Sequence, residues 1–297
     1  MKTNKDYKIE KQKYGFLSVK PTPSADEITR FYADEFYSGD YKNFNDSSLE
    51  VQLNDREFYE GSWRDLAINI KNLSERDLFG QSILDIGCGW GLFLQFMSKF
   101  GMQCYGFDPA PEAVAYASSK GANVKVAGLE KMAVFDERRF DVVILNNVLE
   151  HLLDPIGVVS EIKEKVLAPS GLLVIDVPNE FNPFQLAGRD VHNLNDWWVA
   201  PPGHLNYFSN ESLSNLLEGE GYDVLHSEAS FPLEIFLLFG DCYVGDNSLG
   251  KEIHKKRVNF ELNMRKNGQG EVLRKFYESL AKINIGRQVR IYARPKI

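Results

Sequence analysis

Three closely spaced glycines are the first residues whose types and spacing indicate chemistry. The stretch "SILDIGCGWGLFLQF" covers residues 82–96 and places glycine at 87, 89 and 91, between an apolar run and a helical pattern. Such a turn offers backbone N–H groups beside a positive helix terminus, and without Cβ atoms a ligand can approach closely. A dinucleotide fingerprint needs glycine where Leu92 stands, and no P-loop Gly-Lys-Ser/Thr follows. A tight loop without a ligand is the alternative.

An aspartate about 20 residues further on sharpens this interpretation. Asp108 ends the apolar run "QCYGFD", and Pro109 and Ala110 follow it. A carboxylate at the tip of a strand can accept hydrogen bonds from both hydroxyls of a ribose. The same carboxylate can also cap the next helix, and the two roles are compatible. The pair of signals therefore predicts a nucleoside-bearing ligand.

Histidine is the side chain best suited to act as a base near neutral pH. The five histidines are at positions 151, 192, 204, 226 and 254. His151 follows the apolar run "RFDVVILNN", and His204 lies in the proline-stiffened "APPGHLNYFS". We take these two as catalytic candidates, with packing at a turn as the alternative for His151 and a turn-stabilising hydrogen bond for His204. His192 is a weaker catalytic candidate, and we expect structural roles for His226 and His254.

Alternating apolar runs and helical patterns must position these residues. Between residues 82 and 178 they predict βαβ units on a parallel sheet. The predicted strands cover 82–87, 103–108, 123–127, 139–147, 172–178, 222–229 and 287–295. We divide the chain into an N-terminal arm with cap helices (1–75), a core (76–230) with a substrate loop (178–210), a helical insertion (231–285) and a final core strand (286–297).

Composition excludes several classes of function. The formal net charge of −8 argues against a broad basic face for nucleic acid. No apolar run is long enough for a membrane span, the N-terminus lacks a secretory signal, and the three cysteines form no CxxC pair. We expect a cytoplasmic protein without nucleic-acid or membrane partners. The apolar stretch 234–239 could lie in the core or serve as the surface of a possible homodimer.

Four segments together resemble one known family. "ILDIGCGWGLFL", "YGFDPAPEAVAYA", "FDVVILNNVLEHLLDP" and "GLLVIDVPN" are similar to class I S-adenosylmethionine (SAM) dependent methyltransferases, and "PPGHLNYFS" resembles the "GH-x-x-x-FS" segment of small-molecule members. The resemblance implies SAM as the cofactor. It also implies a doubly wound, Rossmann-like α/β fold with a seven-stranded sheet whose last strand is antiparallel.

The resemblance also implies which residues contact the cofactor. Those expected at its methionine moiety are Asp85, Gly87, Cys88, Gly89 and Gly91. Asp108 and Pro109 are expected at the ribose, and Gly128, Leu129 and Glu130 near the adenine, with Asn146 completing the floor. Glu130 comes one or two places later than the acidic residue of many relatives.

A metal site is a further implication of the resemblance. Some relatives, including ubiquinone-pathway O-methyltransferases, carry an "E-x-x-E-H" motif thought to bind a divalent metal. Here Asn147 replaces the first glutamate and leaves Glu150 and His151. Two ligands are too few for a firm site, so we expect no metal.

The acceptor is less constrained than the cofactor. Six aromatic residues in 178–210 suit either a wall for a planar ring or sugar face, or packing beneath a long loop. Glu180, Asp190 and Asp196 are expected to be solvated loop residues. We expect methyl transfer to a small-molecule acceptor, at an oxygen of a sugar or secondary metabolite. A non-catalytic SAM- or nucleoside-binding protein and a protein side-chain methyltransferase are the alternatives.

Overall fold

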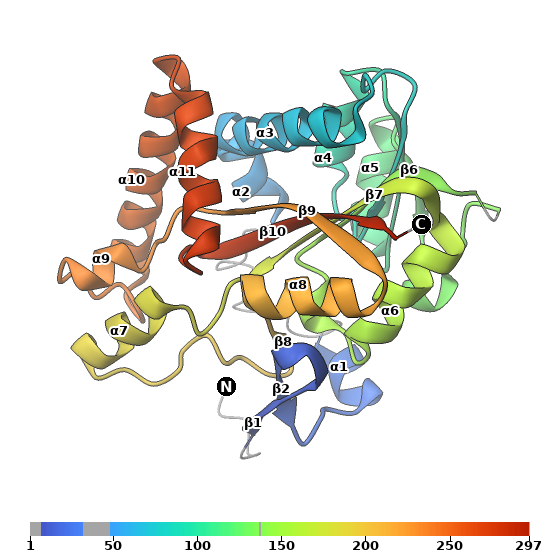
Figure 1. Cartoon of the computed structure of the whole chain (residues 1–297). Helices are drawn as coiled ribbons and strands as arrows, with labels where there is room; N and C mark the ends of the chain where they lie inside the picture. The colour runs from blue at the N-terminus through green and yellow to red at the C-terminus, as the bar shows by residue number, and fades with distance from the viewer. Residues whose placement is uncertain (1–6, 32–47, 137, 297) are drawn as a thin grey trace.

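The computed structural model describes residues 7–31, 48–136 and 138–296 (Figure 1). Its centre is a seven-stranded sheet in the order β5-β4-β3-β6-β7-β10-β9. The strands are β3 (Ser82–Ile86), β4 (Gln103–Asp108), β5 (Asn123–Val126), β6 (Phe140–Asn146), β7 (Leu167–Pro178), β9 (Tyr222–Ala229) and β10 (Gln288–Pro295).

The strand directions confirm the predicted sheet. Strands β3 to β7 pair in parallel, whereas the last strand, β10, is antiparallel to both of its neighbours, β7 and β9. The strand that we predicted from residue 172 begins at Leu167, because Leu167 already pairs with Phe140 before a register shift. The chain order reverses between β3 and β6, and such a switch point is where open α/β sheets bind ligands.

Helices cover both faces of this sheet (Figure 1). On one face, Ile70, Leu94 and Met97 pack with the strand residues Ile83 and Val174. The opposite face is covered by another buried cluster, to which a helix after β6 and a helix before β9 contribute. The covering helices are α3 (Arg56–Ser74), α4 (Leu92–Ser98), α5 (Pro111–Ser119), α6 (Pro155–Glu161) and α8 (Asn210–Gly219).

The N-terminal segment contains strands that the sequence analysis did not predict. β1 (Lys8–Lys11) and β2 (Leu17–Lys20) form a small antiparallel sheet with β8 (Asn206–Tyr207). The helices α1 (Ala25–Phe31) and α2 (Leu49–Asn54) precede α3. Part of the aromatic N-terminal segment, 32–47, lies outside the described residues. Residues 178–210 are more ordered than a loop, since they contain β8 and the helix α7 (Pro183–His192).

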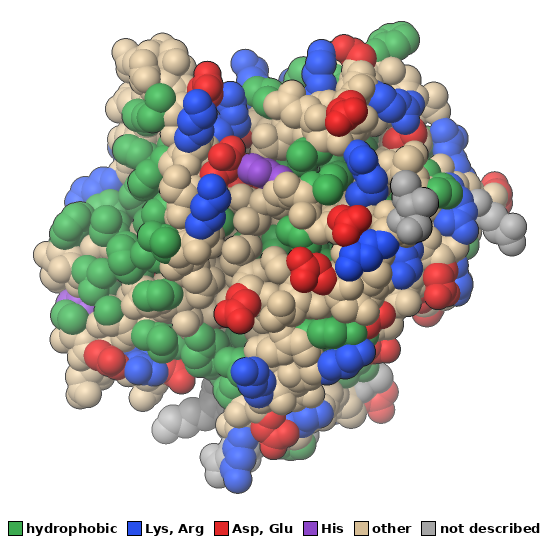
Figure 2. Space-filling view, viewed as in Figure 1, with side chains coloured by type: hydrophobic (Ala, Val, Ile, Leu, Met, Phe, Trp, Pro, Cys, Tyr) green, Lys and Arg blue, Asp and Glu red, His purple; other side chains and the backbone are tan. Residues whose placement is uncertain are grey.

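Residues 231–285 are mainly helical, with α9 (Ile235–Leu238), α10 (Asn247–Lys266) and α11 (Gly270–Lys282). Figure 2 shows hydrophobic side chains gathered over this insertion. Within the apolar stretch 234–239, Leu237 is fully buried while Phe239 is 73% exposed. The stretch therefore has a core side and a surface side, and the homodimer stays a prediction. In the part of the chain that the structure describes, every helix is too short or too polar to cross a bilayer.

Candidate functional site

The glycine turn lies at the carboxyl end of the central strand β3, beside the switch point of the sheet. Gly87, Gly89 and Gly91 all have positive φ, at 77°, 48° and 68°. A Cβ at Gly87 would lie 2.6 Å from the Val148 side chain, and one at Gly91 would lie 2.7 Å from Ala117. At Gly89 nothing lies within 4 Å. Two of the glycines therefore serve close packing, and Gly89 leaves open space on the ligand side.

The backbone amides of the turn are not free for a ligand, contrary to our expectation. Gly87 and Cys88 both donate to the Phe107 carbonyl, at 2.9 and 3.1 Å, and Gly91 donates to the Cys88 carbonyl. The Gly89 amide donates to Asp108 Oδ2 at 2.9 Å. The turn thus uses its donors to fix its own shape. What it offers a cofactor is a surface without side chains.

Asp108 joins the two predicted cofactor elements. Its Oδ2 accepts from the Gly89 amide and its Oδ1 accepts from the Ala110 amide at 2.8 Å, ahead of α5. The side chain is 6% exposed, and burial raises its pKa despite these two hydrogen bonds. Each carboxylate oxygen has a second lone pair, so the oriented carboxylate can still accept from hydroxyl groups.

Asp85 lies near the end of β3, Cys88 lies in the turn itself, and both are buried. The pKa of Asp85 is raised to about 8, mainly by burial and to a smaller extent by the charge of Asp108. Burial also raises the pKa of the Cys88 thiol well above its usual range, so the thiol stays protonated. A cationic group bound near Asp85 would favour its carboxylate form. Since SAM carries an ammonium group, the open surface at Gly89, the oriented Asp108 and the buried Asp85 fit this cofactor.

The other predicted cofactor residues come from the neighbouring strand ends. Gly128, Leu129 and Glu130 follow β5, and the preceding residue, Ala127, donates to the Asp108 carbonyl at 3.1 Å. Pro109 and Asn146 are exposed at the ends of β4 and β6. The structure therefore brings the predicted residues to one edge of the sheet, as the sequence order required. Their contacts with the cofactor stay a prediction.

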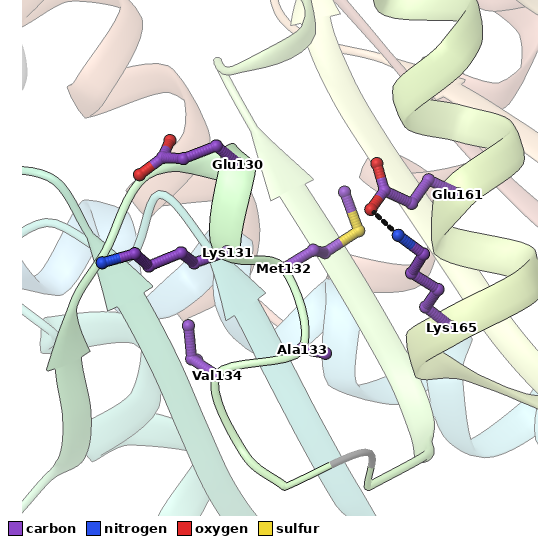
Figure 3. Close-up of a pocket in the computed structure, with 7 residues that line it drawn as sticks. All are labelled: Glu130, Lys131, Met132, Ala133, Val134, Glu161 and Lys165. Atoms are coloured by element: carbon purple, nitrogen blue, oxygen red, sulfur yellow. Dashed lines mark hydrogen bonds and ion pairs between the residues drawn. The ribbon is translucent and has the colours of Figure 1, made fainter.

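A separate surface hollow of about 460 Å³ does not coincide with this edge (Figure 3). Figure 3 shows Met132 extending toward the ion pair between Glu161 and Lys165 on α6 and its continuation. Of the predicted cofactor residues only Glu130 lines the hollow. We therefore place the functional site by the strand ends and not by this pocket.

His151 lies in a short turn, Leu149–His151, after β6. Its Nδ1 is 2.6 Å from the Gly203 carbonyl, which can only accept, so Nδ1 carries the proton. Burial and the charge of His204 lower its pKa to about 4. Nε2 faces Glu150 Oε1 at 3.5 Å, and burial raises the pKa of Glu150 to about 8. At neutral pH this pair is therefore an uncharged imidazole beside an uncharged acid.

The pKa of His204 is shifted in the opposite direction from that of His151. Its Nδ1 lies 3.3 Å from Glu180 Oε1, and the two imidazoles are 5.1 Å apart between ring centroids. Burial lowers the pKa of His204, but the hydrogen bond and charge of Glu180, with a smaller contribution from Glu150 in its ionised form, outweigh burial, so the pKa is raised. With Nδ1 hydrogen-bonded to Glu180, Nε2 is the atom left to exchange a proton.

The site also contains three potential metal ligands that lie close together, namely Glu150, His151 and His204. One ligand atom from each lies within 4.8 Å of the others. One carboxylate and two imidazoles form a donor set that divalent transition metals accept. The sequence analysis counted only Glu150 and His151, because His204 lies far along the chain. Our expectation of no metal stays a prediction, and no step below depends on a metal.

Two acidic residues differ from what the sequence indicated. Glu180 is 7% exposed and not solvated: it lies two residues after the end of β7, and its amide donates to the Phe208 carbonyl. Glu234, fully buried before α9, was missed altogether. The position of Glu180 just after a predicted parallel strand was a usable signal. Glu234 had no such signal, since the segment before it is irregular.

The remaining candidates have structural contacts. His192 Nε2 is 2.8 Å from the Leu237 carbonyl, and His254 pairs with Asp55 at 3.0 Å. Asp190 and Asp196 both pair with Arg189. These residues are therefore engaged outside the His204 site.

A comparison with known families decides the identity of the fold. The model described as "Methyltransferase domain" matches residues 56–227, which is more than half of the chain. The chain belongs to this methyltransferase family. The predicted resemblance to class I SAM-dependent methyltransferases is confirmed, and SAM as the cofactor follows from membership of this family.

Individual relatives match the methyltransferase over shorter lengths. Proteins named "Ubiquinone biosynthesis O-methyltransferase" are 34% identical over 109 residues in Xanthomonas oryzae pv. oryzae and 35% identical over 155 residues in Cereibacter sphaeroides. The first match covers 35% of this chain and 45% of that protein, and the second covers 48% and 61%. The chain thus spans about half the length of the curated relatives it matches.

Solved structures extend the likeness in fold to nearly the whole chain. The plantazolicin methyltransferase BamL, in complex with a triazolic desmethylPZN analog and SAH, has a TM-score of 0.55 at 15% identity and covers 90% of this chain and 96% of that chain. The plantazolicin methyltransferase BpumL, with a monoazolic analog and SAH, has a TM-score of 0.54 at 14% identity and covers 91% and 94%. At these identities the likeness concerns the fold alone.

Proposed function

We propose that this protein transfers a methyl group from SAM to an oxygen of a small-molecule acceptor, a sugar or a secondary metabolite. The observation that carries the proposal is the pairing of Glu180 with His204. Their Oε1 and Nδ1 atoms are 3.3 Å apart, and Glu180 lies just after the end of β7. A hydroxyl keeps its proton at neutral pH, so its methylation benefits from a base. The relatives named O-methyltransferases agree with transfer to oxygen.

In this proposal the glycine turn and the neighbouring strand ends hold the cofactor. Asp108, fixed by the Gly89 and Ala110 amides, accepts the ribose hydroxyls, and Asp85 lies near the ammonium group. The other expected contacts are Gly87, Cys88, Gly91, Pro109, Gly128, Leu129, Glu130 and Asn146. When bound, SAM supplies a methyl carbon that its sulfonium already activates, so the protein's main tasks are alignment and exclusion of water.

His204 acts as the base. Its Nε2 would take the proton of the acceptor hydroxyl. SAM would supply the methyl group, so the products would be a methyl ether and S-adenosylhomocysteine (SAH). Glu180 accepts a hydrogen bond from the His204 Nδ1–H and stabilises the imidazolium that forms. His151 is the weaker base because its pKa is lowered to about 4. Its hydrogen bond to the Gly203 carbonyl positions the residue before His204.

Calorimetry with SAM and SAH, followed by SAH release across a panel of hydroxylated sugars and phenols, tests the proposal. We expect binding of both cofactor forms and turnover that falls at least tenfold in His204→Gln while SAM affinity is kept. His226→Gln is the matched control, because His226 lies on β9 at 3.9 Å from Glu278 and away from the site. Absence of binding to both cofactor forms would defeat the proposal. Binding without any methylated product would favour the non-catalytic alternative.

A further inference from the structure

Three glutamate side chains in and next to the proposed site are buried, and most of their oxygens lack hydrogen-bond partners. Glu150, Glu180 and Glu234 are 1%, 7% and 0% exposed, and they follow β6, β7 and β9 in the chain. Among the described residues, both oxygens of Glu150, both of Glu234 and Oε2 of Glu180 have no hydrogen-bond partner. Burying carboxyl oxygens without hydrogen-bond partners is costly, so these five oxygens indicate a ligand that supplies the partners.

The three carboxylates belong to one electrostatic cluster. Glu180 pairs with His204, and the charges of Arg287 and Glu234 also act on its pKa. The charge of Glu180 in turn contributes to the raised pKa of Glu150. Arg287 reaches Glu234 Oε1 at 3.6 Å, an ion pair longer than a hydrogen bond. The cluster therefore extends from the proposed base to the insertion, which contributes Glu234.

The aromatic residues of 178–210 offer less to a ligand. Trp198 and Tyr207 are 6% and 2% exposed and lie in a buried cluster with Val19. Phe181 packs edge-on against both rings, at centroid distances of 5.2 and 5.8 Å. These three rings therefore pack against one another, which supports the packing alternative of the sequence analysis for Phe181, Trp198 and Tyr207. Recognition near the base then rests on the polar groups.

We propose that the acceptor is a polyhydroxylated, sugar-like compound, and that Glu150, Glu180 and Glu234 hold its hydroxyl groups while His204 deprotonates one of them. The inference rests on the proposed function and narrows its acceptor class. Several adjacent hydroxyls can form hydrogen bonds with several carboxyl groups at once, ionised or protonated, because a hydroxyl both donates and accepts, whereas a simple phenol brings only one hydroxyl. Glu234 acts here as an acceptor-specificity residue contributed by the insertion.

Calorimetric titration of the SAH complex tests the inference. The probes are monosaccharides and nucleotide-activated sugars in one arm and phenols and catechols in the other. We expect binding in the sugar arm, weakened at least tenfold by Glu180→Gln and by Glu234→Gln, with unchanged SAH affinity. Glu252→Gln is the matched control, since Glu252 lies in the insertion with an exposed ion pair to Lys256. A tenfold change corresponds to about 1.4 kcal/mol of binding free energy.

Several results would overturn the inference without touching the proposed function. These are binding only in the phenol arm, no binding in the sugar arm, or equal sugar affinity in the wild type and both glutamine variants. Titration with Mn²⁺ and Zn²⁺ alone is a further arm. Metal binding that Glu150→Gln abolishes would assign Glu150 to a metal and remove it from acceptor recognition. If Glu234→Gln fails to fold, the sugar affinity of Glu180→Gln alone tests the inference. A wild-type protein that binds neither SAM nor SAH would instead defeat the proposed function.

Discussion

The Gly89 amide donates a hydrogen bond of 2.9 Å to Asp108 Oδ2, so the turn after β3 and the tip of β4 are locked together. The same carboxylate accepts from Ala110 through its other oxygen. Asp108 therefore shapes the site before any cofactor binds, in addition to its proposed contact with the ribose. Preorganisation of this kind lowers the ordering cost of binding.

Replacement of Asp108 separates these two roles. Asp108→Asn keeps one acceptor oxygen but loses the charge, and Asp108→Ala loses both. We expect SAM affinity to fall at least tenfold in Asp108→Ala and less in Asp108→Asn, because hydrogen bonds to a carboxylate are worth about 1.5–3 kcal/mol. Calorimetry measures the affinity, and thermal unfolding without ligand reports the structural role. Asp223→Asn, at an exposed position on β9, is the control. Unchanged affinity in Asp108→Ala would refute the ribose assignment.

Gly89 provides a test that does not depend on side-chain chemistry. A Cβ at Gly89 meets no protein atom within 4 Å, so Gly89→Ala should clash only with a bound cofactor. Gly80 is a matched control, since it also has positive φ and open space around its Cβ position. We expect both alanine variants to lose similar stability, about 1 kcal/mol from backbone strain. Only Gly89→Ala should lose SAM affinity, at least tenfold by calorimetry. Equal affinities in the two variants would place the cofactor elsewhere.

The sequence predicted the parts of the site that depend on local order along the chain. Strand ends in a parallel sheet meet at one edge, so Asp85, Asp108 and Asn146 could be placed together from their positions alone. The pairing of Glu180 with His204 could not be predicted, because it depends on how residues 178–210 fold back through α7 and β8. The same holds for Glu234, whose burial depends on packing of the insertion. The donors of the glycine turn were misassigned because the partners of the Gly87, Cys88 and Gly89 amides, the Phe107 carbonyl and the Asp108 carboxylate, belong to the neighbouring strand β4.

Glu150 should make the stability of the protein depend on pH. Its pKa in the folded state is about 8, above its unfolded value of about 4.3. The folded state then binds the proton more tightly, so the free energy of unfolding falls as pH rises between these two values. Glu150→Gln stays uncharged throughout. We expect its melting temperature to match the wild type near pH 5 and to exceed it by several degrees near pH 8, measured by differential scanning fluorimetry.

The control for this pH dependence is Glu252→Gln, which removes an exposed carboxylate from the insertion. Its melting temperature should follow the wild type at both pH values, because an exposed ion pair contributes little to stability. A difference between Glu150→Gln and the wild type that is the same at pH 5 and pH 8 would contradict the raised pKa of Glu150.

Glu180 should control the proton affinity of His204. The Glu180 carboxylate raises the pKa of His204 against the effect of burial, so Glu180→Gln should lower that pKa. The side-chain oxygen of the new glutamine can still accept a hydrogen bond from the His204 Nδ1–H. The tautomer of His204 is therefore kept, and Nε2 remains the titrating atom. Imidazole NMR signals followed against pH measure both properties. Glu278→Gln is the matched control, since Glu278 lies 3.9 Å from His226 and should leave His204 unaffected. A titration of His204 that is the same in the wild type and Glu180→Gln would show that the carboxylate does not tune the proposed base.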